Sequence, residues 1–184
     1  QIAATPDKNW GSWSQGITLD AKSGYQDIGA GIQVGADLLV QHAFKLNGRD
    51  NNPDWVLPHE GPGKGQKDNF GKVGATLKAK VSQTELKVGE LLPVSPVLVF
   101  DPSRQLLTTF SGAWLESKDI KDTKLTLAYI DKINNRYDNQ FRDLTLFAPA
   151  KGKKYYDNGE ASDGMWIAGV DHQFNKEMGA SYWY

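Results

Sequence analysis

The fold of this chain is decided by residues 28–40, which read IGAGIQVGADLLV. Every even-numbered position in this stretch is apolar, and the positions between them are glycine or polar, with the exception of Leu39. A period of two is typical of a β-strand with one apolar face, and thirteen residues is long for a strand. The pattern therefore predicts a single strand over residues 28–40.

The same alternation recurs elsewhere along the chain. It is clear over residues 73–81, where the odd-numbered positions are apolar, and weaker over residues 110–117. Shorter alternating runs lie at 17–21, 86–88, 125–129, 166–170 and 178–184. We therefore expect an all-β, antiparallel fold of about eight strands with no helix.

Composition and residue spacing exclude several classes of function. The 184 residues include 21 Lys+Arg and 22 Asp+Glu, so the net charge of −1 gives no reason to expect a nucleic-acid partner, and there is no cysteine. The three histidines, His42, His59 and His172, lie far apart without a serine-centred motif, which argues against an enzyme. The acidic segments 49–54 and 157–160 lack calcium-loop spacing. We expect neither a metal nor another cofactor.

The connections between the expected strands alternate in length. Short links lie at 23–27, 82–85, 118–123 and 175–177, and long links lie at 45–72, 92–108 and 134–163. In an antiparallel meander this places all short turns at one end, as in outer-membrane barrels with periplasmic turns and extracellular loops. Both ends of the chain would then be extracellular, which predicts a piece of a larger barrel. A complete eight-stranded barrel and a soluble, ligand-binding β-barrel remain as alternatives.

Aromatic residues cluster near the predicted strand ends. Rings with an apolar body and a polar tip settle at the headgroup level of a membrane. We assign this position to Trp10, Trp13, Tyr25, Phe44, Phe70, Phe174 and Trp183. The alternative is that such rings pack against hairpins, as in any β-protein.

Residues 92–107, LPVSPVLVFDPSRQLL, are too apolar for an ordinary extracellular loop. A loop of this kind is expected to fold inward against the barrel wall and narrow a pore, with Asp101 and Arg104 as charges at the constriction. A surface loop with an Asp–Arg turn pair is the alternative. Lys78 and Lys80 share a strand face with Thr76, so they would point into the lumen and either add positive potential or merely solvate the wall.

The segment LKVGELLP at 86–93 and the residues that follow it resemble the OprD family of substrate-specific porins. The matching residues after it are Pro96-Val97, Asp101, Ser103-Arg104, Leu106-Leu107 and 109–112. The similarity continues at 116–120 and 125–127, extends back to 70–78, and spans most of the chain from Trp13 to Tyr184. Where the family often reads Arg-Leu-Leu-Pro, this chain has RQLLT at 104–108.

The resemblance implies an eighteen-stranded barrel, monomeric or a weak homotrimer, in the outer membrane of a Gram-negative bacterium. Residues 1–184 would be part of this single barrel domain, with outer-membrane lipid as a partner and a constriction loop at about 92–108. It also implies passive uptake of small carboxylate-bearing nutrients, such as amino acids or aromatic acids. Arg104 and Arg136 match a basic set along the wall, and Asp101 and Ser103 match the constriction loop.

Overall fold

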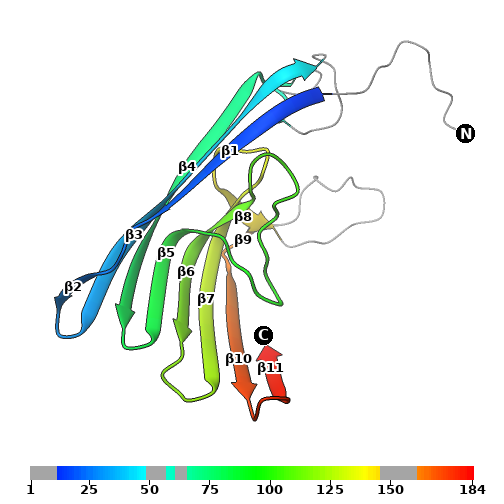
Figure 1. Cartoon of the computed structure of the whole chain (residues 1–184). Helices are drawn as coiled ribbons and strands as arrows, with labels where there is room; N and C mark the ends of the chain where they lie inside the picture. The colour runs from blue at the N-terminus through cyan, green and yellow to red at the C-terminus, as the bar shows by residue number, and fades with distance from the viewer. Residues whose placement is uncertain (1–11, 49–56, 61–65, 146–160) are drawn as a thin grey trace, which may run out of the picture.

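The computed structural model describes residues 12–48, 57–60, 66–145 and 161–184, and these form one antiparallel sheet with small extensions (Figure 1). The strands are β1 (Ser12–Lys22), β2 (Gln26–Gly29), β3 (Ile32–Gly48), β4 (Asn69–Val81), β5 (Thr84–Leu91), β6 (Thr109–Ser117), β7 (Thr123–Asn134), β8 (Arg142–Thr145), β9 (Ala161–Ser162), β10 (Met165–Gln173) and β11 (Gly179–Trp183). The hydrogen-bonded order is β1-β3-β4-β5-β6-β7-β10-β11, with β2 on β3, β8 on β7 and β9 on β8. The all-β, antiparallel prediction is confirmed.

The described strands form an open, curved sheet. β1 pairs only with β3, and β11 pairs only with β10, so the first and last described strands do not pair with each other. This agrees with the expected piece of a barrel rather than a closed eight-stranded one. None of the described residues forms a helix that is long and apolar enough to cross a membrane.

Loop lengths separate cleanly between the two ends of the sheet. The turns β2–β3, β4–β5, β6–β7 and β10–β11 lie at one end, the lower one in Figure 1, and are all short. The connections β3–β4, β5–β6 and β7–β10 leave from the opposite end and are long. A meander of this kind is the topology of outer-membrane barrels.

The structure corrects the strand predicted over 28–40. A tight turn interrupts it, with positive φ angles at Gly29, Ala30 and Gly31, and β3 begins only at Ile32. The predicted link at 23–27 is not a turn but an irregular stretch between β1 and β2. Both strands pair antiparallel with β3, so the chain keeps its direction from β1 into β2. The alternation did not reveal this turn, because Ile28 before it and Ile32 after it both fall on the even-numbered apolar positions.

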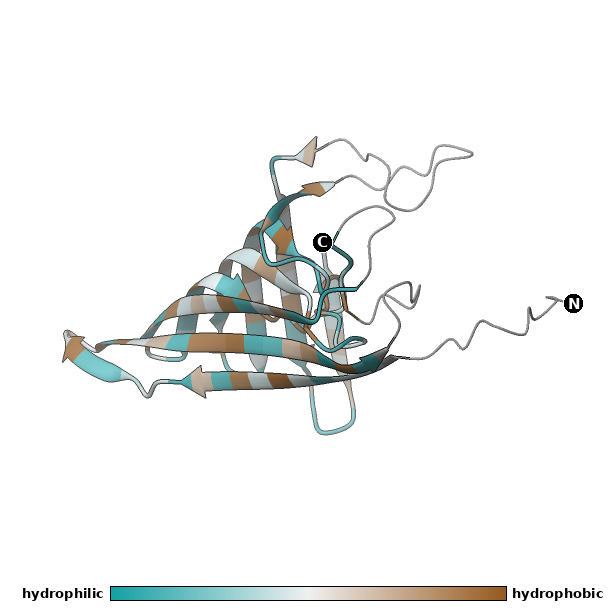
Figure 2. Cartoon of the chain, turned by 90° about the horizontal axis from the view of Figure 1, so that it is seen from above, coloured by the Kyte–Doolittle hydropathy of each residue, from teal (hydrophilic) through white to brown (hydrophobic). Residues whose placement is uncertain are grey.

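Hydropathy alternates along the strands (Figure 2), and the strand register places the apolar set together on the convex face of the sheet. Ala36 pairs with Leu77, and Val34 pairs with Ala79, so the even-numbered set of β3 and the odd-numbered set of β4 share this face. Leu77 is 67% exposed. The exposed apolar side chains of this face include Ile17, Leu19, Leu38, Val73, Leu77, Val88, Leu127, Trp166 and Val170. A large exposed apolar band is what lipid covers, and it disfavours the soluble-barrel alternative.

The concave face carries the polar residues and a compact apolar core. Gln41, Lys72, Thr76 and Lys78 are buried there. The core is formed by Leu91, Phe110, Trp114, Ala128, Ile130 and Ile167. Other parts of the chain therefore cover the inner side of the sheet near β5–β7.

Several aromatic assignments are wrong. Phe70 is buried on the concave side, the hydroxyl of Tyr25 donates to Glu85, and Nε1 of Trp183 donates to Asp171 at 3.2 Å, so these three rings do not face lipid. Trp13 and Phe174 are exposed, whereas Trp10 lies outside the described residues. The outward aromatic set also includes Trp166, which lies beside Tyr129 at a centroid distance of 4.9 Å, and Tyr182.

Leu77→Arg tests the outer face. We expect it to lower the free energy of unfolding by about 2–4 kcal/mol, the cost of a cation in the middle of the apolar band of a barrel. Urea-dependent unfolding in lipid vesicles measures it. Gln33→Arg, on the concave face of the neighbouring strand, is the control and should change little. Equal effects of the two substitutions would contradict the assignment of faces.

Candidate functional site: the loop over the concave face

Residues 92–108, between β5 and β6, form a folded loop that lies on the concave face. Leu106 is buried in a cluster with Ala43, Leu57 and Phe70. Leu98 and Phe100 pack against the concave-face core. Burial of these side chains accounts for part of the apolar content of the loop, whereas Val94, Val97 and Val99 are exposed.

The loop has its own internal hydrogen bonds. The amide of Phe100 donates to the carbonyl of Pro93 at 3.0 Å, and the amide of Ser95 donates to the carbonyl of Leu98 at 3.0 Å. The amide of Thr108 donates to the carbonyl of Asp101 at 3.0 Å, which closes the second half of the loop. The loop is therefore a defined element and not an extended connection.

Hydrogen bonds to β1 and β3 fasten the loop to the wall. The amide of Leu107 donates to Oε1 of Gln41 at 2.6 Å, and Nε2 of Gln105 donates to the carbonyl of Ser14 at 3.2 Å. A Cβ at Gly16 would lie 2.8 Å from the carbonyl oxygen of Gln105, so glycine provides the room for this approach. Gln41 is buried, and its Nε2 has no partner among the described residues.

Three of the predicted site residues come together at the loop. Nη1 of Arg136, just beyond β7, forms an ion pair with Asp101 and donates to the hydroxyl of Ser103 at 3.0 Å. The amide of Ser103 donates to Oδ1 of Asp101 at 2.7 Å. Hydrogen bonds from Ser103, together with the charge of Arg136, hold the pKa of Asp101 below its ordinary value of 3.8. Asp101 therefore stays ionised in mildly acidic solution.

Arg104 stands apart from this ion pair. Its guanidinium is exposed and donates to the carbonyl of Ser103 at 3.2 Å. Among the described residues it has no carboxylate partner. Its positive charge is thus available to solvent and solutes, whereas the charge of Arg136 is balanced by Asp101.

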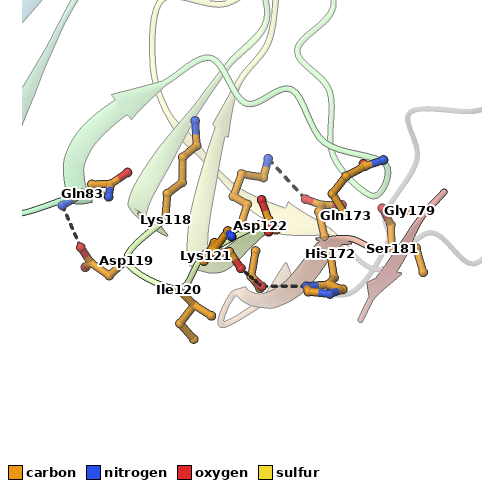
Figure 3. Close-up of a pocket in the computed structure, with 14 residues that line it drawn as sticks. Gln83, Lys118, Asp119, Ile120, Lys121, Asp122, His172, Gln173, Gly179 and Ser181 are labelled. Carbon is orange, nitrogen blue, oxygen red and sulfur yellow. Dashed lines mark hydrogen bonds and ion pairs between the residues drawn. The ribbon is translucent and has the colours of Figure 1, made fainter. Parts of the chain in front are cut away.

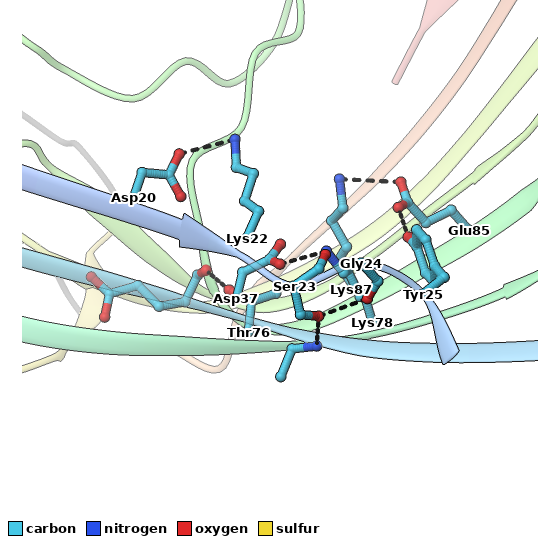
Figure 4. A network of polar contacts seen from close by, with 12 residues as sticks. Asp20, Lys22, Ser23, Gly24, Tyr25, Asp37, Thr76, Lys78, Glu85 and Lys87 are labelled. Carbon is cyan, nitrogen blue, oxygen red and sulfur yellow. Dashed lines mark hydrogen bonds and ion pairs between the residues drawn. The ribbon is translucent and has the colours of Figure 1, made fainter. Parts of the chain in front are cut away.

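Lys78 and Lys80 lie on the concave face near the short turns, away from the loop. Lys78 is buried, forms an ion pair with Asp37 and donates to the carbonyl of Ser23 at 2.8 Å (Figure 4). Lys80 is half-buried and lies 5.9 Å from the ring of Tyr25. The two lysines that the alternation pattern groups together therefore differ in their surroundings.

Lys72 and Glu90 belong to the site but were missed from the sequence. Nζ of Lys72 donates to the carbonyls of Asn134 and Asn135, each at 3.2 Å, and so fastens the end of β7 that leads into Arg136. Glu90 accepts from the hydroxyl of Thr109 at the end of the loop. The alternation of 72–80 indicated that Lys72 faces inward, but no pattern indicated its partners.

The turns at the other end of the sheet are also joined to one another (Figure 3). The amide of Gln83 donates to Asp119 at 2.9 Å, and hydrogen bonds from Ser82, Thr84 and Gln83 lower the pKa of Asp119 to about 2. The amide of Gln173 donates to the carbonyl of Asp122 at 2.8 Å. An open hollow of about 680 Å³ lies between these turns. Within the described segments, no three His, Asp or Glu side chains converge as a metal site.

Comparison with known proteins identifies the family. The model of the outer-membrane porins of the OprD family matches residues 2–184. The chain belongs to the OprD family of outer-membrane porins. Membership confirms the predicted family and the bacterial outer membrane as its location, and the curated relatives are porins rather than enzymes.

Three relatives illustrate the likeness. The porin-like protein GalP of Pseudomonas putida is 32% identical over 174 residues, which cover 92% of this chain and 40% of GalP. The crystal structure of OccAB2 from Acinetobacter baumannii superposes with a TM-score of 0.84 at 37% identity, covering 94% of this chain and 42% of that one. OpdK of Pseudomonas aeruginosa, solved with vanillate, gives a TM-score of 0.78 at 31% identity, with coverages of 94% and 42%. The chain spans about two fifths of the length of these porins.

Asp101→Asn tests the ion pair in the porin that contains this chain. Loss of the carboxylate frees the charge of Arg136, so we expect the anion-over-cation permeability ratio to rise about two- to tenfold at pH 7. Because the pKa of Asp101 lies below its ordinary value of 3.8, its negative charge is lost only as the pH falls below that ordinary value. The parent and Asp101→Asn should therefore still differ at pH 4, and zero-current potentials in salt gradients measure this. Equal permeability ratios of the parent and Asp101→Asn at pH 4 would contradict this prediction.

Lys72→Met tests the hold on the end of β7. The buried carbonyl of Asn134 and the half-buried carbonyl of Asn135 lose their donor, so we expect the free energy of unfolding to fall by about 1–3 kcal/mol. Urea-dependent unfolding in vesicles provides the measurement. Lys118→Met, in the exposed β6–β7 turn, is the matched control and should leave stability unchanged. An unchanged free energy of unfolding in Lys72→Met would show that the contacts of Lys72 do not contribute to stability.

Proposed function

We propose that the chain is part of a passive, solute-selective channel of the outer membrane in which the loop 92–108 forms the constriction. The observation that carries this proposal is the seating of an apolar loop on the concave face, fastened through Gln41 and through the Asp101–Arg136 ion pair. A loop fixed to the wall at several points narrows the lumen to a constant width. Such a width selects solutes by size as well as by charge.

We further propose that the channel prefers small carboxylate-bearing solutes. Arg104 supports this, because an exposed guanidinium without a carboxylate partner can bind a solute carboxylate through two parallel hydrogen bonds. The relative OpdK was solved with vanillate, which is itself a carboxylate. A solute must bind well enough to enter and weakly enough to leave, and one exposed arginine satisfies both conditions.

In this proposal the other predicted residues have separate roles. Asp101 and Ser103 hold Arg136 and keep the loop against the end of β7, so Arg136 contributes to the shape of the constriction as well as to its charge. Lys80 adds positive charge farther along the lumen, toward the short turns. Lys78 is neutralised by Asp37 and stabilises the wall.

Arg104→Ala tests the proposed function. Removing the exposed guanidinium should widen the throat, raise single-channel conductance and lower the preference for carboxylates about two- to tenfold, because a charge acts more strongly in a narrow lumen of low dielectric. Planar-bilayer recordings of the full-length porin measure both quantities. Arg136→Ala should also weaken anion attraction, with less change in conductance, because the loop stays fastened to the wall through Gln41 and Gln105. Unchanged conductance and selectivity in Arg104→Ala would remove Arg104 from the constriction.

A further inference from the structure

The link between β1 and β2 is folded over the concave face near the short turns. Lys22 pairs with Asp37, and Gln26 pairs with Val34, so three residues on this side oppose two on β3. The extra residue makes a bulge, and bulges redirect side chains. Ser23 closes it, because its amide donates to the carbonyl of Ala36 at 3.1 Å and its hydroxyl accepts from the amide of Ala36 at 2.8 Å.

Two further contacts place this bulge on the lumen side. A Cβ at Gly35 would lie 2.7 Å from the carbonyl oxygen of Gly24, so the bulge covers the inner face of β3 at that position. Nζ of Lys78, from the inner face of β4, donates to the carbonyl of Ser23. The bulge therefore projects inward from the wall.

Tyr25 extends from the bulge across two strands. Its hydroxyl donates to Glu85 of β5, which is separated from the β1–β2 edge by β3 and β4 (Figure 4). The ring consequently lies across the inner face of the sheet. Nζ of Lys78 lies 5.0 Å from its centroid and is buried beneath the bulge, so the surface that Tyr25 leaves exposed faces the lumen.

Lys80 supplies a second cation over this ring. Its Nζ lies 5.9 Å from the ring centroid, and among the described residues it forms no ion pair with a carboxylate. The neighbouring lysines on the same face are paired, Lys78 with Asp37 and Lys87 with Glu85 at 3.1 Å. An aromatic surface and an unbalanced ammonium group thus lie side by side in the lumen.

We propose that Tyr25 and Lys80 form a second solute-contact site, at the short-turn end of the lumen, for solutes that join a carboxylate to a flat ring. The inference rests on the proposed channel function. Lys80 binds the carboxylate, and Tyr25 contacts the flat ring, since stacked aromatic rings attract each other beyond the area that they bury. Glu85 and Lys78 are positioning residues that keep the ring across the wall.

Two probes of equal charge and similar size test the ring contact. Benzoate is flat, whereas cyclohexanecarboxylate is not, and each is added from the short-turn side to the full-length porin in a planar bilayer. The measurement is the concentration that half-blocks the channel current. We expect Tyr25→Leu to weaken the benzoate block about 3- to 10-fold and to leave the cyclohexanecarboxylate block unchanged. An unchanged ratio of the two values would overturn the site.

Lysine variants test the charge. Lys80→Gln should weaken the block by both carboxylates by a similar factor. Lys22→Gln is the matched control, because Lys22 is an exposed lysine on the same face and is paired with Asp20 at 2.9 Å. This substitution should leave the block by each of the two carboxylates unchanged. Equal effects of Lys80→Gln and Lys22→Gln would overturn the assignment of Lys80.

The design separates this site from the channel proposal. If neither carboxylate blocks the parent porin, the proposed carboxylate preference fails and the site fails with it. If both block the parent but Tyr25→Leu keeps the ratio, only the site fails. Heat-modifiable migration in electrophoresis verifies that each variant barrel has folded, and Tyr25→Met repeats the test should Tyr25→Leu not fold.

Discussion

The hydrogen bonds between neighbouring strands are the constraint on which the rest of this structure depends. Lipid offers no partner for backbone amides and carbonyls, so a strand that crosses it must be paired along its length. β3 illustrates this, because it pairs with β1 and β2 on one side and with β4 from Ile32 to Phe44 on the other. Once the strands are paired, alternate residues face lipid and lumen. Only the lumen-facing side chains, and the segments that fold over the concave face, can then contact a solute.

Charge on the inner face is largely balanced within the wall. Lys78 pairs with Asp37, Lys87 with Glu85, and Lys124 with Asp171 at 3.5 Å. These pairs fasten strands that lie in a lumen of reduced dielectric, and they also cancel most of the field that a passing ion would meet. In the proposed channel, selectivity along this part of the wall depends on where an unbalanced cation stands, and much less on how many lysines the strands carry. Arg104 at the loop and Lys80 beside Tyr25 are such cations.

Much of the fold was predictable because membrane strands obey a simple period. The alternation over 73–81 places Leu77 outside, and the apolar composition of 92–107 predicted a loop that avoids water. The errors have equally simple causes. Residues 28–40 read as one strand because Gly29 and Gly31 accept positive φ without breaking the phase of the apolar positions. Tyr25 and Trp183 were assigned to the lipid face because proximity to a strand end does not specify which face a ring takes.

Local patterns in the sequence were enough to specify the strand class, the apolar outer face, the separation of short and long connections and the apolar loop. The pairing of polar groups is set by the folded sheet as a whole. Arg136 and Asp101 are 35 residues apart, and Tyr25 and Glu85 are 60 residues apart. The physical reason is that a period of two sets the face of a residue and a short turn sets the neighbouring strand. A contact between strands that are not adjacent depends on the curvature of the sheet, on the bulge at Ser23 and on the path of the loop, none of which has a local signal.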